Sequence, residues 1–384
     1  MAKLGEVFTI ASGGTPDKKK PFYYENGTIP WVKTGDLKTQ YVPTGIDCIT
    51  EEGLNNSPAK LFPPNTVLVA MYGATIGACS ILSYEAATNQ ACAAFLPNEN
   101  VLPTYLYYFL LSKRDQFVKD GVGGAQPNIS AGYLKNVQFD LVPVRQQEVI
   151  VERLDEIENL IALRKEQLAK LDQLVKSRFI EMFGDCLTNP KGWKTKCLED
   201  IAEVGSSKRV FVEELQEDGI PFYRGTEVGA LAEGKQITPE LFITEEHYTE
   251  LCEATGTPQI GDLLMPSICP DGRIWVVNTD KPFYFKDGRV LWVHAIDASY
   301  HPVFLLYTLK DRIMTDYSSI ASGTTFAELK IFALKKCRVF DVPLSLQNQF
   351  AAYVEQADKS KLAIQQSLDR LELLKKSLMQ QYFG

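Results

Sequence analysis

Histidine is scarce in this 384-residue chain, which contains three: His247, His294 and His301. The eight cysteines are scattered along the chain and include no C-x-x-C pair. A zinc site needs Cys or His ligands at short spacings, and neither residue type is clustered here. The sequence therefore predicts no metal centre. Dispersed thiols in a chain without an export signal are expected to stay reduced.

Long hydrophobic runs are also lacking, since no stretch approaches the roughly 20 apolar residues that a membrane-spanning helix needs. The N-terminal segment MAKLGEVFTI does not have the basic-then-apolar pattern of a secretory signal. We therefore expect a cytoplasmic protein with no membrane partner. The length indicates two or three domains, and a hydrophobic content of 45% is enough to form buried cores.

Signatures of catalysis are missing as well. The sequence contains no G-x-x-x-x-G-K-[ST] phosphate loop, no H-E-x-x-H zinc motif and no [DN]-P-P-[FY] amino-methyltransferase motif. We therefore predict no catalytic residues in this chain. A catalytic site formed only by residues that meet in three dimensions stays open as an alternative.

Positive charge is in deficit, because the formal net charge is −8. The excess of acids is concentrated in residues 185–342, in segments such as EELQED (213–218) and TEEHYTELCE (244–253). Net charge governs nonspecific attraction but does not exclude a local basic face. On charge alone, the chain is a poor candidate for binding DNA.

What the sequence does contain is an internal repeat. IPWVKTGDL (29–37) returns as IPFYRGTEV (220–228), with an Ile-Pro, two bulky apolar residues, a cation, an acid and an aliphatic residue at matching positions. Residues 143–184 align without a gap to 343–384, and both segments end in Phe-Gly. Further matches support two copies of a unit of roughly 190 residues. These are LGEVFTIAS (4–12) with LEDIAEVGS (198–206) and PPNTVLVAMYGATIG (63–77) with PQIGDLLMPSICPDGRI (258–274).

The first part of each copy has a mixed pattern. Short apolar runs bounded by Gly and Pro, such as 66–72 and 273–278, predict strands and turns. Segments 103–119 and 301–317 predict helices between them. The fold class expected from this pattern is α+β.

The second part of each copy predicts a long helix. Apolar residues in 150–179 recur at alternating spacings of four and three, and 350–378 keeps the same register, which is typical of a coiled coil. Lys361 stands where the first copy has Ile161, and Ile364 stands where it has Arg164, so each helix is expected to suit the other. We predict an antiparallel pair about 60 Å long. The alternative is that each helix packs only on its own domain. The predicted contact residues are Leu154, Ile157, Leu168, Leu171, Val354, Ile364, Leu368 and Leu371.

The order of domain, helix, domain, helix resembles the DNA specificity subunit of Type I restriction-modification enzymes. Local patterns carry the same resemblance along the whole chain, although the second copy departs from them at 268–274 and 321–330. They are SGGTP (12–16), NGTIPWVKTGDL (26–37), YGATIG (72–77), GGAQPNIS (123–130) and VPVRQQEVIVERLDEIE (142–158).

The resemblance implies two target-recognition domains, 1–142 and 185–342, that each recognise half of a split double-stranded DNA target. It implies that helices 143–184 and 343–384 act as a spacer and as the docking surface for two methyltransferase subunits. Those subunits would bind S-adenosylmethionine, with no cofactor in this chain. Restriction and translocase activities would belong to a further subunit.

Within this interpretation, cations are candidates for phosphate contacts, and amide side chains suit paired hydrogen bonds to adenine. Tyr72 and Thr75 stand on a Gly-containing turn where the backbone can approach DNA closely. Any one of these residues alone is an ordinary surface or turn residue, and only the set favours DNA binding. The complete set of candidates is Lys19, Lys33, Lys38, Tyr72, Thr75, Gln126, Asn128, Lys208, Arg209, Arg224, Arg273, Thr324 and Thr325.

A non-catalytic coiled-coil scaffold that joins two protein-binding heads is the main alternative function. The acidic second half of the chain is its best support. DNA affinity that falls steeply with salt would separate the two functions.

Overall fold

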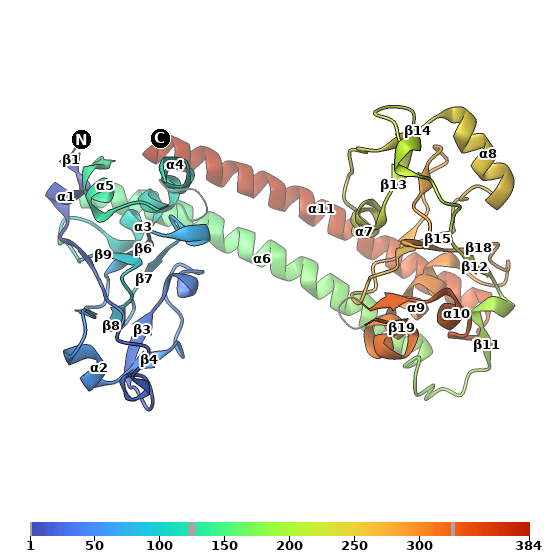
Figure 1. Ribbon diagram of the computed structural model, residues 1–384, viewed down its shortest axis with the longest axis horizontal. Helices are drawn as coiled ribbons and strands as arrows, with labels where there is room; N and C mark the ends of the chain where they lie inside the picture. Colours follow the sequence, from blue (N-terminus) through green and yellow to red (C-terminus); the bar gives the residue numbers. More distant parts are fainter. Residues whose placement is uncertain (1, 122–127, 324–326) are drawn as a thin grey trace. The chain divides into compact units, whose positions relative to one another are not determined.

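Two long helices and several small β-sheets make up the protein in the computed structural model, which describes residues 2–121, 128–323 and 327–384 (Figure 1). The helices are α6 (Val144–Phe183) and α11 (Leu344–Phe383). The chain divides into two compact units. Unit 1 contains Met1–Glu166 and Gln365–Gly384, and unit 2 contains Gln167–Ile364. Each unit therefore includes part of both long helices.

Unit 1 contains two four-stranded sheets and one short pair of strands. The first sheet is antiparallel throughout, in the order β2 (Ile10–Ser12), β9 (Cys92–Phe95), β6 (Val67–Ala70) and β7 (Cys79–Ile81). The second has the order β4 (Cys48–Ile49), β3 (Ile29–Val32), β8 (Ala86–Thr88) and β5 (Leu61–Phe62), with β3 and β8 parallel. The pair is β1 (Ala2–Lys3) with β10 (Gln138–Phe139).

The helices of the first domain pack beside these sheets. The segment 103–119, predicted as one helix, is two helices that meet at Lys113. Rings of α3 such as Tyr105 and Phe109 pack with Phe139 and with Phe383 of α11, so the end of the chain completes the core of unit 1. The helices are α1 (Leu4–Val7), α2 (Glu51–Asn55), α3 (Pro103–Ser112), α4 (Arg114–Asp120) and α5 (Ala131–Asn136).

Unit 2 repeats this strand order. Its main sheet has the order β12 (Glu203–Gly205), β18 (Val290–His294), β15 (Leu263–Pro266) and β16 (Trp275–Val276). Its second sheet has the order β14 (Phe242–Ile243), β13 (Ile220–Tyr223) and β17 (Tyr284–Phe285), with β13 and β17 parallel. Two short pairs are β11 (Thr195–Cys197) with β21 (Arg338–Phe340) and β19 (Ala321–Ser322) with β20 (Glu328–Leu329). The helices are α7 (Gly225–Ala232), α8 (Glu245–Thr255), α9 (Pro302–Ile320) and α10 (Ile331–Lys335).

The internal repeat is thus present in the topology. In both units a central strand beginning with Ile-Pro pairs antiparallel on one side and parallel on the other, which is β3 in unit 1 and β13 in unit 2. The α+β fold class predicted from the sequence, with two long antiparallel helices, is confirmed.

A buried glutamine joins each long helix to its domain. Gln147, near the start of α6, has no exposed surface. Its side-chain oxygen accepts the Leu102 N–H (2.9 Å), and its amide nitrogen donates to the carbonyls of Asn100 (2.9 Å) and Val142 (2.8 Å). Both N–H groups of the side-chain amide donate, and its oxygen accepts one hydrogen bond. Because these groups have partners, the amide can be buried at little cost.

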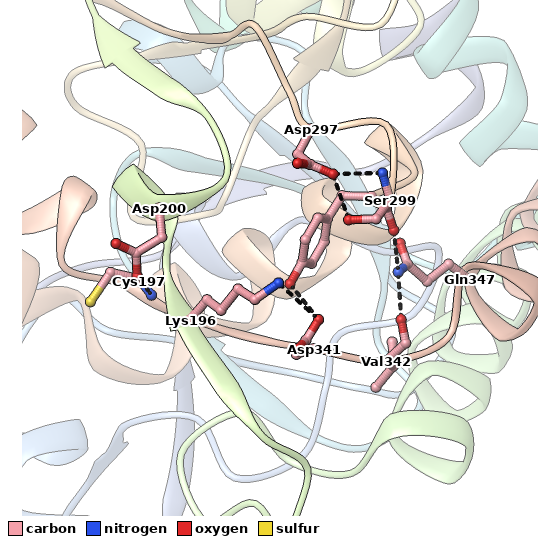
Figure 2. A network of polar contacts seen from close by, with 9 residues as sticks. Lys196, Cys197, Asp200, Asp297, Ser299, Asp341, Val342 and Gln347 are labelled. Carbon is pink, nitrogen blue, oxygen red and sulfur yellow. Dashed lines mark hydrogen bonds and ion pairs between the residues drawn. The ribbon is translucent and has the colours of Figure 1, made fainter.

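Gln347 of α11 makes the same three bonds in unit 2. It accepts the His301 N–H (2.8 Å) and donates to the carbonyls of Ser299 (3.0 Å) and Val342 (2.9 Å). Figure 2 shows the amide of Gln347 bonded to the last two of these residues. The identical residue in the two sequence copies therefore has an identical structural role.

The two long helices run antiparallel in each unit. In unit 1, Ile150 and Leu154 near the start of α6 share a hydrophobic core with Met379 and Phe383 near the end of α11. In unit 2, the end of α6 packs on the start of α11, where the Phe179 ring lies 5.4 Å from that of Phe350. Each of these helix ends therefore packs both on a globular core and on the other helix, which excludes the alternative that each helix packs only on its own domain.

The contact residues predicted on these helices differ in burial. Those near the helix ends are buried, as is Leu368, whereas Leu168, Leu171, Ile364 and Leu371 are half-buried. The exceptional Lys361 lies on this face and forms an ion pair with Asp172 of α6 (2.7 Å). A long flexible side chain can pack its stem on the apolar face and keep its ammonium group on a carboxylate.

Candidate nucleic-acid interface

In both copies of the Ile-Pro motif, the central strand is followed by a short helical segment, and an acidic side chain caps the backbone N–H of the residue just before that segment. After β3, the carboxylate of Asp36 accepts the Lys33 N–H (2.8 Å) and closes a short 3-10 helix, η2 (Thr34–Asp36). After β13, Glu227 accepts the Arg224 N–H in the same way (2.8 Å) and starts α7. The acid three residues after the cation thus fixes where the strand stops. The motif places a cation at the same position in both units.

In unit 1, the surroundings of this position are structural. Trp31 is buried, and its indole N–H donates to the Gly14 carbonyl (3.1 Å). Lys33 forms an ion pair with Asp47. This hydrogen bond to Asp47 is the main reason why the pKa of Lys33 is raised above its usual value.

In unit 2, Arg224 is held more firmly. Its Nε and Nη2 donate to the two oxygens of Glu227 (3.1 and 2.6 Å), and Nη2 also contacts Glu240 (3.1 Å). The bond to Glu227 raises the pKa of Arg224 further. Burial of Glu227 disfavours its charged form, but hydrogen bonds, first of all from Arg224, outweigh burial and lower its pKa to about 2. The pair is therefore ionised at every pH near neutrality.

Arg224 lines a pocket of about 540 Å³ in unit 2. The pocket lies at the start of α7, where the ends of β13 and β15 meet the turn between β17 and β18. Four of its lining residues are cationic and one is acidic, so its local charge is opposite to that of the whole chain. The lining residues are Arg224, Gly225, Thr226, Glu227, Pro266, Ser267, Ile268, Arg273, Lys286 and Arg289.

The other three pocket cations differ in how they are paired. Arg273 forms an ion pair with Asp271 (2.8 Å), and Arg289 with Glu328. Within the described parts of the chain, the Lys286 ammonium group makes no ion pair or hydrogen bond. Lys286 is exposed and is therefore the pocket cation most readily available to an anion.

The loop after β12 brings two more cations to this end of unit 2. The hydroxyls of Ser206 and Ser207 donate to backbone carbonyls of β18 and β17 (2.7 and 2.6 Å). Arg209 forms an ion pair with Asp287 in the β17–β18 turn (3.3 Å). Lys208 and Arg209, both predicted from the sequence, therefore lie next to the turn that lines the pocket.

Unit 1 has the same backbone frame at this place. Met71 N donates to the Ala91 carbonyl (2.8 Å), as Ser267 N does to that of Arg289 (2.8 Å). The carbonyl of Met71 accepts from Ile129 N (2.9 Å), and that of Ser267 from Leu329 N (2.7 Å). These matching bonds align Ala91 with Arg289.

Two predicted residues of unit 1 meet in this frame. Tyr72 and Asn128 form an isolated antiparallel bridge just after β6, and both are exposed. Thr75 lies on the following turn and donates its hydroxyl to the Tyr72 carbonyl (3.1 Å). The turn depends on Gly73 and Gly77, whose φ angles of 68° and 74° favour glycine.

The remaining predictions for single residues are less informative. Lys19 and Lys38 are exposed, and among the described residues no contact joins them to Tyr72 or Asn128. Gln126, Thr324 and Thr325 lie outside the described residues.

Lys286 and Arg289 were missed from the sequence. They flank Asp-Gly in the segment FYFKDGRVLWVH (283–294), which is an Asp-Gly turn between two apolar strands. An Asp-Gly pair between two apolar runs is typical of a turn, so both basic residues could have been recognised as loop residues, although β17 and β18 belong to different sheets and do not form a hairpin.

Within the described ranges, no group of His, Cys, Asp or Glu residues is arranged to hold a metal ion. The described helices include none that is both long and apolar enough to cross a membrane. The site is a surface pocket lined mainly by guanidinium, ammonium and hydroxyl groups with one carboxylate, which suits binding of a polyanion.

Comparisons with known proteins agree with this picture. A family model described as the Type I restriction modification DNA specificity domain matches residues 1–173 and again 190–373. The MjaIX specificity subunit of a Type I restriction enzyme from Methanocaldococcus jannaschii is 26% identical over 385 residues, covering 92% of this chain and 85% of the relative.

Two solved structures share the fold. A chain from a study of complex assembly and conformational transition of the type I R-M system has a TM-score of 0.63 at 18% identity, covering 100% of this chain and 96% of that one. The crystal structure of the Type-I restriction-modification S subunit from M. genitalium has a TM-score of 0.54 at 15% identity, covering 100% of this chain and 95% of that one.

Proposed function

The chain belongs to the Type I restriction-modification DNA specificity family, and on that premise we propose that it binds a split double-stranded DNA target, with each unit recognising one half. The observation that carries the proposal is that one backbone frame occurs twice with different side chains at equivalent positions. The pairs are Lys33 and Arg224, Asn89 and Lys286, Ala91 and Arg289, and Asn128 and Glu328. A shared frame with exchanged side chains is what two different half-sites require.

The pocket chemistry supports contacts of two kinds. Lysine and arginine at the surface neutralise phosphates without regard to sequence. Amide and guanidinium groups match the paired donors and acceptors that base edges present in the major groove. Unit 1 supplies the amide of Asn128, and unit 2 supplies the guanidinium of Arg224.

The long helices are the proposed docking surface for two methyltransferase subunits. Besides its buried face, α6 exposes apolar side chains at Val149, Leu160 and Leu163. Their spacings of 11 and 3 residues place them on one side of the helix. Burial of such a stripe against a partner would remove apolar surface from water.

Catalysis is assigned to the partners in this proposal. The methyltransferase subunits would hold S-adenosylmethionine, and restriction and translocase subunits would join the same assembly. This chain would select the DNA sequence on which they act.

The proposal is tested by DNA binding of the purified complex at increasing salt. We expect a steep loss of affinity with salt, and Lys286→Ala should reduce the slope of log affinity against log salt by about 0.9, which corresponds to one phosphate contact. Lys194→Ala removes the same charge from the exposed segment preceding β11 and should leave the slope unchanged. An affinity that does not depend on salt would contradict DNA binding and favour the protein-scaffold function instead.

A further inference from the structure

Arg224 is the pocket cation whose side chain is most rigidly positioned. One edge of its guanidinium group, Nε with Nη2, is bonded to both oxygens of Glu227. Such a two-bond fork fixes the plane of the guanidinium as well as its position. The remaining pocket cations have one ion-pair partner or none among the described residues.

Glu227 is itself fixed in place. Its side chain is only 14% exposed, and it also accepts the Thr226 hydroxyl (2.9 Å) and the Arg224 backbone N–H (2.8 Å). A carboxylate held by four hydrogen bonds keeps its position when a ligand approaches from solvent. It acts as a positioning residue for the arginine.

The outer edge of the same guanidinium is held only loosely. Nη1 makes no hydrogen bond to any residue in the described ranges. Nη2 contacts Glu240, whose side chain is 73% exposed. An exposed ion pair contributes little to stability, and a ligand can therefore replace Glu240 at small cost.

Resting on the DNA-binding function above, we propose that Arg224 determines specificity by donating two hydrogen bonds to O6 and N7 of a guanine in the half-site bound by unit 2. Glu227 would orient the guanidinium, and the guanine would displace Glu240 from it. The DNA phosphates would be bound by the other pocket cations, Lys286, Arg273 and Arg289. Guanine presents two neighbouring acceptors in the major groove, which matches the outer edge of a guanidinium.

Unit 1 is expected to lack this contact. Its equivalent residue, Lys33, is a flexible ammonium that points its charge at Asp47. A lysine cannot form the planar fork that distinguishes guanine by geometry.

The test uses the full chain assembled with its methyltransferase partner. Base preference is measured at every target position by methylation of a DNA library in which one position at a time is randomised. Arg224→Lys and Glu227→Gln should each lower the preference for guanine at the same single position, by roughly tenfold or more for the lysine variant. Glu246→Gln, an exposed acid of α8 outside the pocket, should change no preference.

If Arg224→Lys weakened DNA binding without changing the base preference at any target position, Arg224 would be a phosphate contact, and the proposal would be overturned. Glu240→Gln gives an independent result if the arginine variant fails to assemble. It should bind the same target several-fold more tightly, and an unchanged affinity would contradict the displacement of Glu240. A parent complex without any sequence preference would contradict the proposed function itself, whereas a preserved preference in both variants contradicts only the role of Arg224.

Discussion

At the scale of single residues, the two buried glutamines show how the same polar group is used twice. Gln147 and Gln347 each satisfy one backbone donor and two backbone acceptors at the junction of domain and helix. Losing such an amide leaves three buried backbone groups without partners. The identity of these residues in the two sequence copies therefore reflects a shared requirement of the fold.

Replacing Gln347 with leucine should destabilise unit 2. Because the His301 N–H and two carbonyls lose their partner, we expect the free energy of unfolding to fall by about 3 kcal/mol. Urea denaturation of the parent and the variant measures the difference. Gln349→Leu, an exposed neighbour on the same helix, is the matched control and should change stability little. Equal losses in the two variants would show that the bonds of Gln347 do not matter.

His301 gives a pH-dependent prediction. Burial lowers its pKa below the usual 6.5, and its Nδ1 accepts the Val303 N–H at the start of α9 (3.1 Å). The unfolded chain therefore binds a proton at higher pH than the folded one. The stability due to neutral His301 is complete above pH 6.5 and is lost as the pH falls below it.

His301→Asn keeps a capping side chain but removes the titration. Between pH 7.5 and 5.5, the parent should lose more unfolding free energy than this variant. Thermal unfolding at both pH values measures this difference, and parallel losses would contradict the assignment.

The sequence predicted individual cations but not their pairing. Arg224 was identified from the repeated motif, and Glu227 is close to it in the chain. Glu240 is 16 residues away, and Glu328 is 39 residues from its partner Arg289. Such pairs depend on how strands meet in three dimensions, which local patterns do not contain.

At the scale of elements, lysines on the inner face of α11 help to set how it pairs with α6. In unit 1, Lys375 forms an ion pair with Glu158, and both side chains are at least two-thirds buried. In unit 2, Lys361 pairs with Asp172. A charge on a contact face favours the alignment that offers it a partner and disfavours others.

Reversing one charge should weaken this pairing. Lys375→Glu places two carboxylates together, and we expect a loss of about 1–2 kcal/mol in unfolding free energy, between the values for exposed and buried pairs. Adding Glu158→Lys should restore most of it. The control Lys376→Glu alters an exposed position one residue away. A double-mutant cycle by chemical denaturation measures the coupling, and a coupling near zero would contradict a role in helix pairing.

Helix periodicity was the most reliable signal in the sequence, because a contact face repeated over 40 residues is hard to mistake. Strands of two to four residues carry much less information. The segment 273–278 predicted a strand of which only Trp275–Val276 forms one. A further repeat was available: Ile-Thr-Glu-Glu occurs at 49–52 and 243–246, where threonine caps α2 and α8. A threonine followed by two glutamates is a recognised signal for the start of a helix, so both helices could have been predicted from this repeat.

At the scale of the whole molecule, duplication explains why one chain contains two units with the same strand order. The repeat and the α+β class followed from the sequence because matching segments kept their order along the chain. The pocket could not be predicted from the sequence, because its lining residues come from four separate segments of unit 2. The proposed division of labour is that the shared frame supplies the fold and the exchanged side chains supply two specificities.

The most direct test of this account is an exchange of residues 185–342 for the corresponding segment of another member of the family. The target sequence of the resulting complex is then determined by mapping methylated sites in DNA. The account predicts that one half of the target changes to that of the donor protein while the other half stays the same. A change in both halves would contradict recognition by two separate units.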